Sequence, residues 1–511
     1  MSNDERRPKT PPESSTKKTK KSLRSRTDSA ATAASPRDEN SDFKAFVERR
    51  CTSGVATDGQ HFAVLRDRTN VALTVDRAVE ELAVAWYAQH QRVASSRERS
   101  DAADLLRVLS NQNRGHPLRI RSAWFQDAGE VLIDPGDDSS EVIVVAAEGW
   151  SRAVRRDVLF RRARTFAALR VSDKPIGRKA GFALLRSLLP FDDPDVAAVV
   201  VALLLTSWLG GAAQPVVLFV GAAGSGKTTT ARFLALLVDP TTHQRGGPLP
   251  ANEQAWKAVA NTARVLMFDN TGRITAMVSD QLCRVSTGGE MTTRRLYTDD
   301  EAHVTELLAP VWLTSVEPEI FKGDLATRTV MLRLPGLDRD SRTGESELLR
   351  AQREAAPILT RFLLDLMVEV LRLRDEESGH PSMHRLTELE TVLRCVDRLL
   401  GTRGVDRLGQ AAADLATEII EGNPVAQEVV GHLPEVEGEH SPTHLHKLLT
   451  EAVGGERGRL PRNWPETPAV LSRRLSECGP ELEQVYGIRL EWGRRGRSRD
   501  RFIRVSPCDE A

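Results

Sequence analysis

A glycine-rich loop at residues 221–228 is the part of the sequence whose residue types and spacing point most directly to a chemistry. Its sequence, Gly-Ala-Ala-Gly-Ser-Gly-Lys-Thr, matches the pattern G-x-x-x-x-G-K-[ST]. The apolar run 216–220 before it predicts a strand, and residues 229–238 after it predict a helix. In this setting glycines let backbone N–H groups turn inward toward phosphate oxygens, and the helix N-terminus adds its positive dipole end. The sequence therefore predicts a nucleotide phosphate site.

The cofactors expected at this loop are ATP and Mg²⁺. Lys227 would contact the β- and γ-phosphates as a point charge, and the Thr228 hydroxyl would hold the metal ion. The predicted ATP-binding residues are Gly221, Gly224, Ser225, Gly226, Lys227, Thr228 and Thr229.

A second apolar run, residues 264–269, ends in Asp269 about forty residues after the glycine-rich loop. A nucleotide-hydrolysing site of this type needs a carboxylate at the end of a neighbouring strand, where it holds Mg²⁺. Thr228 and Asp269 are therefore the predicted metal ligands.

Asn270 stands where many ATPases that activate water with a carboxylate have Glu. Three alternatives stay open. Asn270 orients a water without taking its proton, a carboxylate such as Glu253 or Asp280 acts as the base, or hydrolysis is slow and the site works as a switch.

Two further strand boundaries carry polar groups. The run 310–315 ends in hydroxyls, so Thr314 is either a sensor of the γ-phosphate or an ordinary strand-end residue. Arg328 precedes the apolar run 329–334, where it is either a finger that reaches a neighbouring subunit's nucleotide or a salt-bridge partner of Asp324. The predicted catalytic residues are Lys227, Asp269, Asn270, Thr314 and Arg328.

The composition is that of a globular protein with several domains. The 511 residues include 71 Lys plus Arg and 71 Asp plus Glu, so any basic site has to be local. The five cysteines are scattered without a C-x-x-C pair, which is typical of a reducing, cytoplasmic setting. The apolar run 196–209 is too short to cross a bilayer and predicts a buried helix, so no membrane contact is expected.

The expected fold is an α/β P-loop NTPase core with mostly parallel strands covered by helices. An α+β domain precedes it, with helices near 76–90 and 99–110 and an antiparallel meander built from segments at 118–125, 130–133, 141–146 and 152–158. The predicted units are a disordered basic tail (1–42), the α+β domain (43–173), a helical lead-in (174–213), the core (214–340), a helical region ending in a loop at 421–442 (341–442), and a winged-helix-like unit (443–511).

The order of the motifs resembles the helicase-type ATPases of bacterial phages, plasmids and integrative elements, which are similar to superfamily-three helicases and lie within the wider AAA+ class. The resemblance therefore implies an AAA+-like core. The resemblance rests on the glycine-rich loop and on the segments 265–270, 279–284, 287–289, 294–300 and 323–328. In such helicases the segment that corresponds to 288–308 carries a hairpin that grips DNA. The resemblance implies that Arg294, Arg295 and Tyr297 contact single-stranded DNA; taken alone, they fit an ordinary solvated hairpin equally well. Val316 and Asn270 depart from the family's pattern.

A second basic segment lies near the C-terminus. A predicted helix from 468 to 478 leads to strands at 488–492 and 502–505, joined by a run with four arginines: Arg494, Arg495, Arg497 and Arg499. Helix, strand, basic hairpin and strand fit a winged helix whose wing contacts a phosphate backbone, against the alternative of a solvated charged hairpin. The lysines and arginines of the tail are open to the same two interpretations.

Three functions fit these features. The first is an oligomeric motor, such as a hexamer, that moves along single-stranded DNA in a ring channel, replicates a mobile element and meets other replication proteins. The second is a nucleotide-dependent switch that regulates DNA or partner binding with weak or no hydrolysis, which Asn270 favours. The third, a small-molecule kinase, has no use for Thr314 and Arg328 at their positions.

Overall fold

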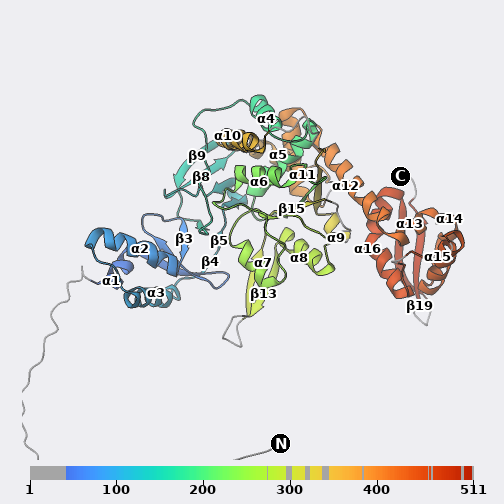
Figure 1. The fold of residues 1–511 in the computed structure, drawn as a ribbon, viewed down its shortest axis with the longest axis horizontal. Helices are drawn as coiled ribbons and strands as arrows, with labels where there is room; N and C mark the ends of the chain where they lie inside the picture. Colours follow the sequence, from blue (N-terminus) through green and yellow to red (C-terminus); the bar gives the residue numbers. More distant parts are fainter. Residues whose placement is uncertain are drawn as a thin grey trace, which may run out of the picture.

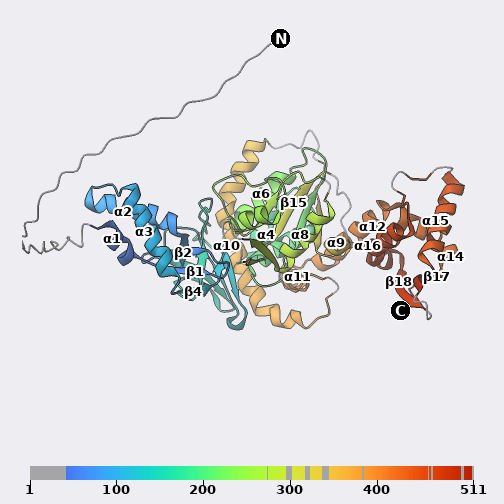
Figure 2. The same cartoon turned by 90° about the horizontal axis from the view of Figure 1, so that it is seen from below.

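The computed structural model describes residues 42–272, 274–294, 302–316, 323–336, 344–382, 385–457, 460–461, 464–495 and 500–508. The molecule is elongated, with the N-terminal helices at one end, a parallel sheet in the middle and a small C-terminal unit at the other end (Figures 1 and 2). Of the predicted tail, only Asp42 is described, and its side chain caps the first helix.

The central sheet positions the predicted chemical residues. Its strands are β11 (Val216–Val220), β12 (Leu266–Phe268), β15 (Val311–Ser315) and β16 (Thr329–Arg333), in the order β12-β15-β11-β16. All neighbours are parallel, and Val216 lies beside both Val311 and Thr329. Because the strands run in one direction and in register, their carboxyl ends meet at one edge of the sheet, where the glycine-rich loop begins.

Helices cover both faces of this sheet, which gives the expected mixed α/β architecture in three layers. Alternate strand residues such as Val217 and Phe219 pack against one group of helices, and their neighbours Val216 and Leu218 pack against the other. The first group is α4 (Arg178–Ser187), α5 (Pro194–Trp208), α6 (Lys227–Val238), α10 (Glu345–Ser378) and α11 (Thr387–Leu400). The second includes α7 (Glu253–Ala260), α8 (Ala276–Thr287), α9 (Gly323–Ala326) and α12 (Gly404–Glu421). In the described chain, no helix combines the length and apolarity needed to span a membrane.

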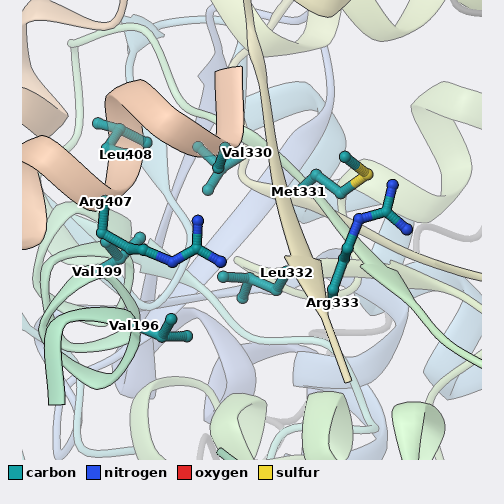
Figure 3. A pocket seen from close by; sticks show the side chains of 9 residues that line it. Val196, Val199, Val330, Met331, Leu332, Arg333, Arg407 and Leu408 are labelled. Carbon is teal, nitrogen blue, oxygen red and sulfur yellow. The ribbon is translucent and has the colours of Figure 1, made fainter. Parts of the chain in front are cut away.

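The edge strand β16 is covered rather than open. A pocket of about 20 Å³, room for roughly one water molecule, lies between β16, α5 and α12 (Figure 3). Its walls are apolar, and the guanidinium of Arg407 reaches across them while Arg333 points away and pairs with Glu418 of α12. This edge is therefore closed to a further strand.

Two sheets precede the core. The first has six strands in the order β4-β1-β2-β3-β10-β5: β1 (Cys51–Ala56), β2 (His61–Leu65), β3 (Val71–Thr74), β4 (Arg114–His116), β5 (Leu118–Arg119) and β10 (Leu159–Arg161). The helices α1 (Phe43–Arg50), α2 (Val75–His90) and α3 (Ser96–Ser110) pack on it. The second is the meander β6 (Ser122–Phe125), β7 (Glu130–Ile133), β8 (Glu141–Ala146) and β9 (Gly149–Val154).

The two sheets differ in how well the sequence predicted them. The helices α2 and α3 and the four-stranded meander are confirmed. The predicted segment 118–125 is divided, because β5 joins the first sheet and only β6 belongs to the meander, and the last strand, predicted at 152–158, is β9 at 149–154. The six-stranded sheet was missed because β10 joins β3 and β5 through parallel pairs between distant segments, which leave no local turn signal. Val131 and Ile143 of the meander share a core with α5 and α10, so this sheet rests on the central helices.

The C-terminal unit contains α13 (Pro424–Gly431), α14 (Leu433–Val436), α15 (Pro442–Arg457), α16 (Pro468–Tyr486) and the sheet β17-β19-β18, formed by β17 (Gly438–His440), β18 (Ile488–Arg495) and β19 (Asp500–Pro507). The prediction of a loop at 421–442 is wrong, because α13 begins at Pro424. The Asn423 side chain accepts hydrogen bonds from the first amides of α13, and Pro424 occupies the first helical position, which is a start signal that the sequence carries.

A buried carboxylate ties these parts together. Asp239 ends α6 and is fully buried; it accepts hydrogen bonds from Arg121 (2.9 Å), Arg245 (2.6 Å) and the amides of Arg264 (2.7 Å) and Val265 (3.1 Å). Burial alone would raise the pKa of Asp239, but Arg245 and Arg121 outweigh it and lower the pKa to about 2. The ionised carboxylate therefore stabilises the fold above about pH 4, and this contribution is lost as the pH falls toward 2.

We expect Asp239→Asn to lower the free energy of unfolding by about 3–5 kcal/mol, because it leaves buried guanidiniums without their carboxylate. The control is Asp101→Asn, which breaks an exposed pair with Arg97 at 4.0 Å and should cost less than about 1 kcal/mol. Urea unfolding of both variants measures the difference. Equal stability of the two would contradict the central place given to Asp239.

Candidate nucleotide-binding site

The glycine-rich loop lies between the carboxyl end of β11 and the start of α6, as its sequence predicted. Gly224 and Gly226 have φ angles of +79° and +83°, which side chains other than glycine rarely adopt. A Cβ on Gly221 would lie 2.7 Å from Ser225 Oγ and 3.0 Å from the carbonyl oxygen of Leu334. All three glycines are thus required by the path of the backbone.

Lys227 and Thr228, the first two residues of α6, lie where the binding of phosphate groups needs a positive charge and a hydroxyl. The Lys227 ammonium donates to the carbonyl oxygens of Gly221 (2.7 Å) and Ala222 (2.8 Å), so it reaches back across the loop. The Thr228 hydroxyl donates to Asp269 Oδ1 at 2.7 Å. The loop is curled around the helix N-terminus, a geometry that fits the phosphates of a nucleotide.

Asp269 joins three of the predicted residues. It follows β12, and its Oδ1 accepts hydrogen bonds from Thr228 and from Thr314 at the end of β15. The Thr314 hydroxyl also accepts the Asn270 amide at 2.9 Å. Burial alone would raise the pKa of Asp269, but the hydrogen bonds from Thr314 and Thr228 outweigh it and hold the pKa below its usual value. An ionised carboxylate beside a hydroxyl is a suitable ligand pair for Mg²⁺.

Asn270 has an unusual backbone conformation. Its φ is +52°, in the left-handed region that Asn and Asp tolerate better than other residues with side chains. Its side chain is exposed. A Glu here would strain the backbone, which is a local physical reason for Asn where many ATPases have Glu. Of the other predicted bases, Glu253 is paired with Arg284 at 3.1 Å.

Two residues near Asp269 were missed from the sequence. A Cβ on Gly246, which has a φ of +113°, would lie 2.9 Å from Asp269 Cβ, so this glycine allows the loop before α7 to pass behind the carboxylate. The positive charge of Arg232, on α6, helps to lower the pKa of Asp269. The Gly-Gly pair at 246–247 was the signal that the sequence offered for this loop. Only the fold shows that the pair lies beside β12.

Arg328 precedes β16 and therefore lies at the amino ends of the parallel strands, whereas the glycine-rich loop lies at their carboxyl ends. Its side chain is buried and donates to Asp324 at 3.2 and 3.3 Å. Arg385 pairs with the same carboxylate at 2.6 Å. The predicted salt bridge is therefore present, and Arg328 is too distant to act on its own subunit's loop; its role as a finger toward a neighbouring subunit stays a prediction.

Three of the predicted DNA-contacting residues are described, and they lie on two hairpins. β13 (Gly289–Arg294) pairs with β14 (Ala302–Leu307), and Arg294 ends β13; Arg295 and Tyr297 lie outside the described residues. On the second hairpin, Arg494 and Arg495 belong to β18, whereas Arg497 and Arg499 lie outside the described residues. Arg495 is paired with Glu439 at 3.2 Å.

The fold and the site define a mixed α/β protein with a phosphate-loop motif at the carboxyl edge of a parallel sheet. Residues 182–417 match the family model described as the actinomycete integrative conjugative element replication protein, and residues 425–510 match that of the AICE RepA C-terminal domain. The two matches follow one another and together span most of the described chain after the meander. The chain belongs to the replication proteins of actinomycete integrative conjugative elements, which confirms the predicted link to a mobile element.

Solved structures give weaker similarities. The C-terminal region of NrS-1 covers 92% of this chain and 100% of its own, at 9% identity and a TM-score of 0.40. The SCCmec type IV Cch helicase covers 89% and 93%, at 11% identity and a TM-score of 0.43. The JCV helicase covers 47% and 64%, at 15% identity and a TM-score of 0.23. Curated proteins yield no match.

We expect Asn270→Glu to be about 1 kcal/mol less stable than Asn270→Asp, because Asp tolerates the left-handed backbone and Glu does not. Both variants add the same charge beside Asp269, so their comparison isolates the backbone effect. Thermal unfolding of the two proteins measures it. If the Glu variant were as stable as the Asp variant, backbone strain would not explain the residue at this position.

Proposed function

We propose that the chain binds ATP with Mg²⁺ at the glycine-rich loop and hydrolyses it, and that hydrolysis drives movement of this replication protein along single-stranded DNA. The observation that carries the proposal is the hydrogen-bonded set of Thr228, Asp269 and Thr314 beside the Lys227 ammonium. These groups come from three neighbouring elements and converge at one edge of the sheet. Phosphoryl transfer depends mainly on positioning and on neutralising charge, and this set supplies both.

Each group has a distinct part in this proposal. Lys227 and the amides at the start of α6 hold the phosphates, and Thr228 with Asp269 holds the metal ion that neutralises their charge. Thr314 links the end of β15 to Asp269 and to the Asn270 amide, so it can report the state of the site to the strand beside β11. Arg328 would serve a neighbouring subunit of a ring, after release from Asp324.

We expect Lys227→Ala to reduce ATP turnover at least about a hundredfold, because the charge that contacts the transferred phosphate is lost. Turnover of the wild type should rise when single-stranded DNA is added. The matched control is Lys447→Ala, an exposed lysine of the C-terminal unit, which should turn over ATP like the wild type. Turnover that survives Lys227→Ala would place hydrolysis elsewhere.

A nucleotide-dependent switch is the second candidate, and Asn270 favours it. The exposed Asn270 side chain cannot accept a proton from water as a carboxylate would. Tight ATP binding with no turnover that depends on Lys227, with or without DNA, would support the switch over the motor.

We further propose that the C-terminal unit is a winged helix that binds duplex DNA. Its order of two helices, a strand, two helices and a hairpin, and its sheet order β17-β19-β18, support this assignment. Trp492 of β18 packs on α16, where its Nε1 donates to Ser472 Oγ at 3.3 Å. Arg494 lies on the same face of β18, opposite Arg501 of β19, so both extend the surface of α16.

The arginines of this hairpin are not equivalent. Arg495 and Arg504 are held by Glu439, whereas Arg494 and Arg501 form no ion pair with any described residue. A paired guanidinium has to leave its carboxylate before it can contact a phosphate, which weakens its contribution. Arg494 and Arg501 are therefore the stronger candidates for phosphate contacts.

We expect the double variant Arg494→Ala/Arg501→Ala to weaken binding to duplex DNA by about tenfold and to reduce the salt dependence of binding. The control, Arg495→Ala/Arg504→Ala, removes the same charge and should weaken binding clearly less. Fluorescence anisotropy over a salt series measures both. Equal reductions in affinity would show that only the net charge of the hairpin matters.

A further inference from the structure

A groove of about 460 Å³ lies on the side of the central sheet away from the glycine-rich loop. Its walls come from the first sheet, the meander, the end of α7 and the chain that follows β14. Arg264 and Ala309, which line it, precede β12 and β15, so the groove lies at the amino ends of the parallel strands. Its volume falls within the range of roughly 300–1,000 Å³ typical of ligand sites.

The groove carries an excess of positive charge. Its charged lining residues are Asp58, Arg119, Arg161 and Arg264. Asp58 and Arg161 pair at 2.9 Å and cancel. Arg119 is exposed and forms no ion pair within the described chain, and the Arg264 guanidinium donates to the carbonyl oxygens of Ser207 and Leu308, each at 2.8 Å.

The buried cluster behind the groove adds to this excess. Arg121, Arg245 and Arg264 surround one carboxylate, Asp239, so three positive charges face a single negative one. Burial lowers the pKa of Arg264 to about 10; Asp239 opposes this shift and Arg119 adds to it. Arg264 is therefore still charged at neutral pH. Buried charge that is not neutralised projects a positive potential into the adjoining groove.

Two further features of the wall suit a bound strand. Ser122 lines the groove, and its buried hydroxyl has no hydrogen-bond partner among the described residues, so this polar group is not used by the described part of the fold. Leu307, Leu308 and Ala309 line the groove and lie where β14 ends, so the groove adjoins the base of the β13–β14 hairpin. A strand in the groove can continue along that hairpin.

We propose that this groove holds one strand of nucleic acid, with a phosphate beside Arg119 and Arg264, and delivers it to the β13–β14 hairpin. The proposal deepens the proposed function, on whose DNA-dependent motor it rests. It adds a contact surface that is separate from the C-terminal unit and whose lining includes none of Arg294, Arg494 and Arg495, the predicted DNA-binding residues that the structure describes. The DNA strand would pass the amino ends of the β-strands, whereas the nucleotide would lie at their carboxyl ends.

The test uses the full chain and a fluorescein-labelled oligothymidylate of about thirty nucleotides. Arg119→Glu should weaken binding by about tenfold and reduce the slope of log affinity against log salt by roughly 0.7 for each phosphate that the variant no longer neutralises. The control is Arg97→Glu, an arginine of α3 that is 91% exposed and has only a distant partner, and its affinity should stay within about twofold of wild type. Thermal unfolding confirms that both variants fold.

A second measurement locates the strand without changing charge. A photo-reactive group attached to Thr57→Cys, at an exposed position on the groove rim, should crosslink to the oligothymidylate. Competition with thymidine monophosphate separates a strand from a free nucleotide. Loss of the crosslink at equal concentrations of monophosphate and oligonucleotide would assign the groove to a mononucleotide and overturn the proposal.

The outcomes separate this inference from the proposed function. If the wild type binds the oligothymidylate and hydrolyses ATP, while Arg119→Glu behaves like Arg97→Glu and Thr57 gives no crosslink, the groove proposal fails and the motor stands. If the wild type neither binds the strand nor hydrolyses ATP, the proposed function fails, and the groove proposal falls with it.

Discussion

The structure depends on one buried carboxylate, that of Asp239. It closes the C-terminal end of α6, and its oxygens accept the amides of Arg264 and Val265 just before β12. The N-terminus of α6 carries Lys227 and Thr228, and the end of β12 leads to Asp269. The far ends of the two elements that hold the candidate nucleotide site are thus fixed to the same side chain. Arg121, from the turn before the meander, ties the N-terminal half to that point.

The same carboxylate leaves a surplus of positive charge. Three guanidiniums around Asp239 cannot all be neutralised by it, and their remaining hydrogen-bond partners are backbone carbonyl oxygens and the Thr241 hydroxyl, which are all uncharged. Carbonyl groups satisfy the N–H donors but carry no net charge, so the field of the cluster persists. In a chain with equal numbers of acidic and basic residues, such local excess is the means by which one face can attract a polyanion.

The central sheet separates two kinds of site. The residues of the candidate nucleotide site gather at the carboxyl ends of the strands, and the positively charged groove lies at the amino ends, roughly 16 Å away for a strand of five residues. The parallel strands themselves connect the two ends of the sheet. The chain through β12 leads from Arg264 and Val265 to Asp269, and the chain through β15 leads from Ala309 to Thr314. Rigid elements therefore link the candidate nucleotide site to the groove, as the proposed motor and the proposed switch both require.

The sequence by itself determined the glycine-rich loop, the strands around it and the residues at their ends, because a loop of this kind is specified by local backbone needs and buried strands by continuous apolar runs. It also determined the meander, whose turns are local. The tertiary structure decided what depends on distant contacts. It brought Thr314 onto Asp269, paired Arg385 with Asp324 and paired Arg495 with Glu439. It placed β10 between β3 and β5, and it gathered Arg121, Arg245 and Arg264 around Asp239. No spacing along the chain predicts such groupings, because these residues come into contact only when separate layers of the fold pack together.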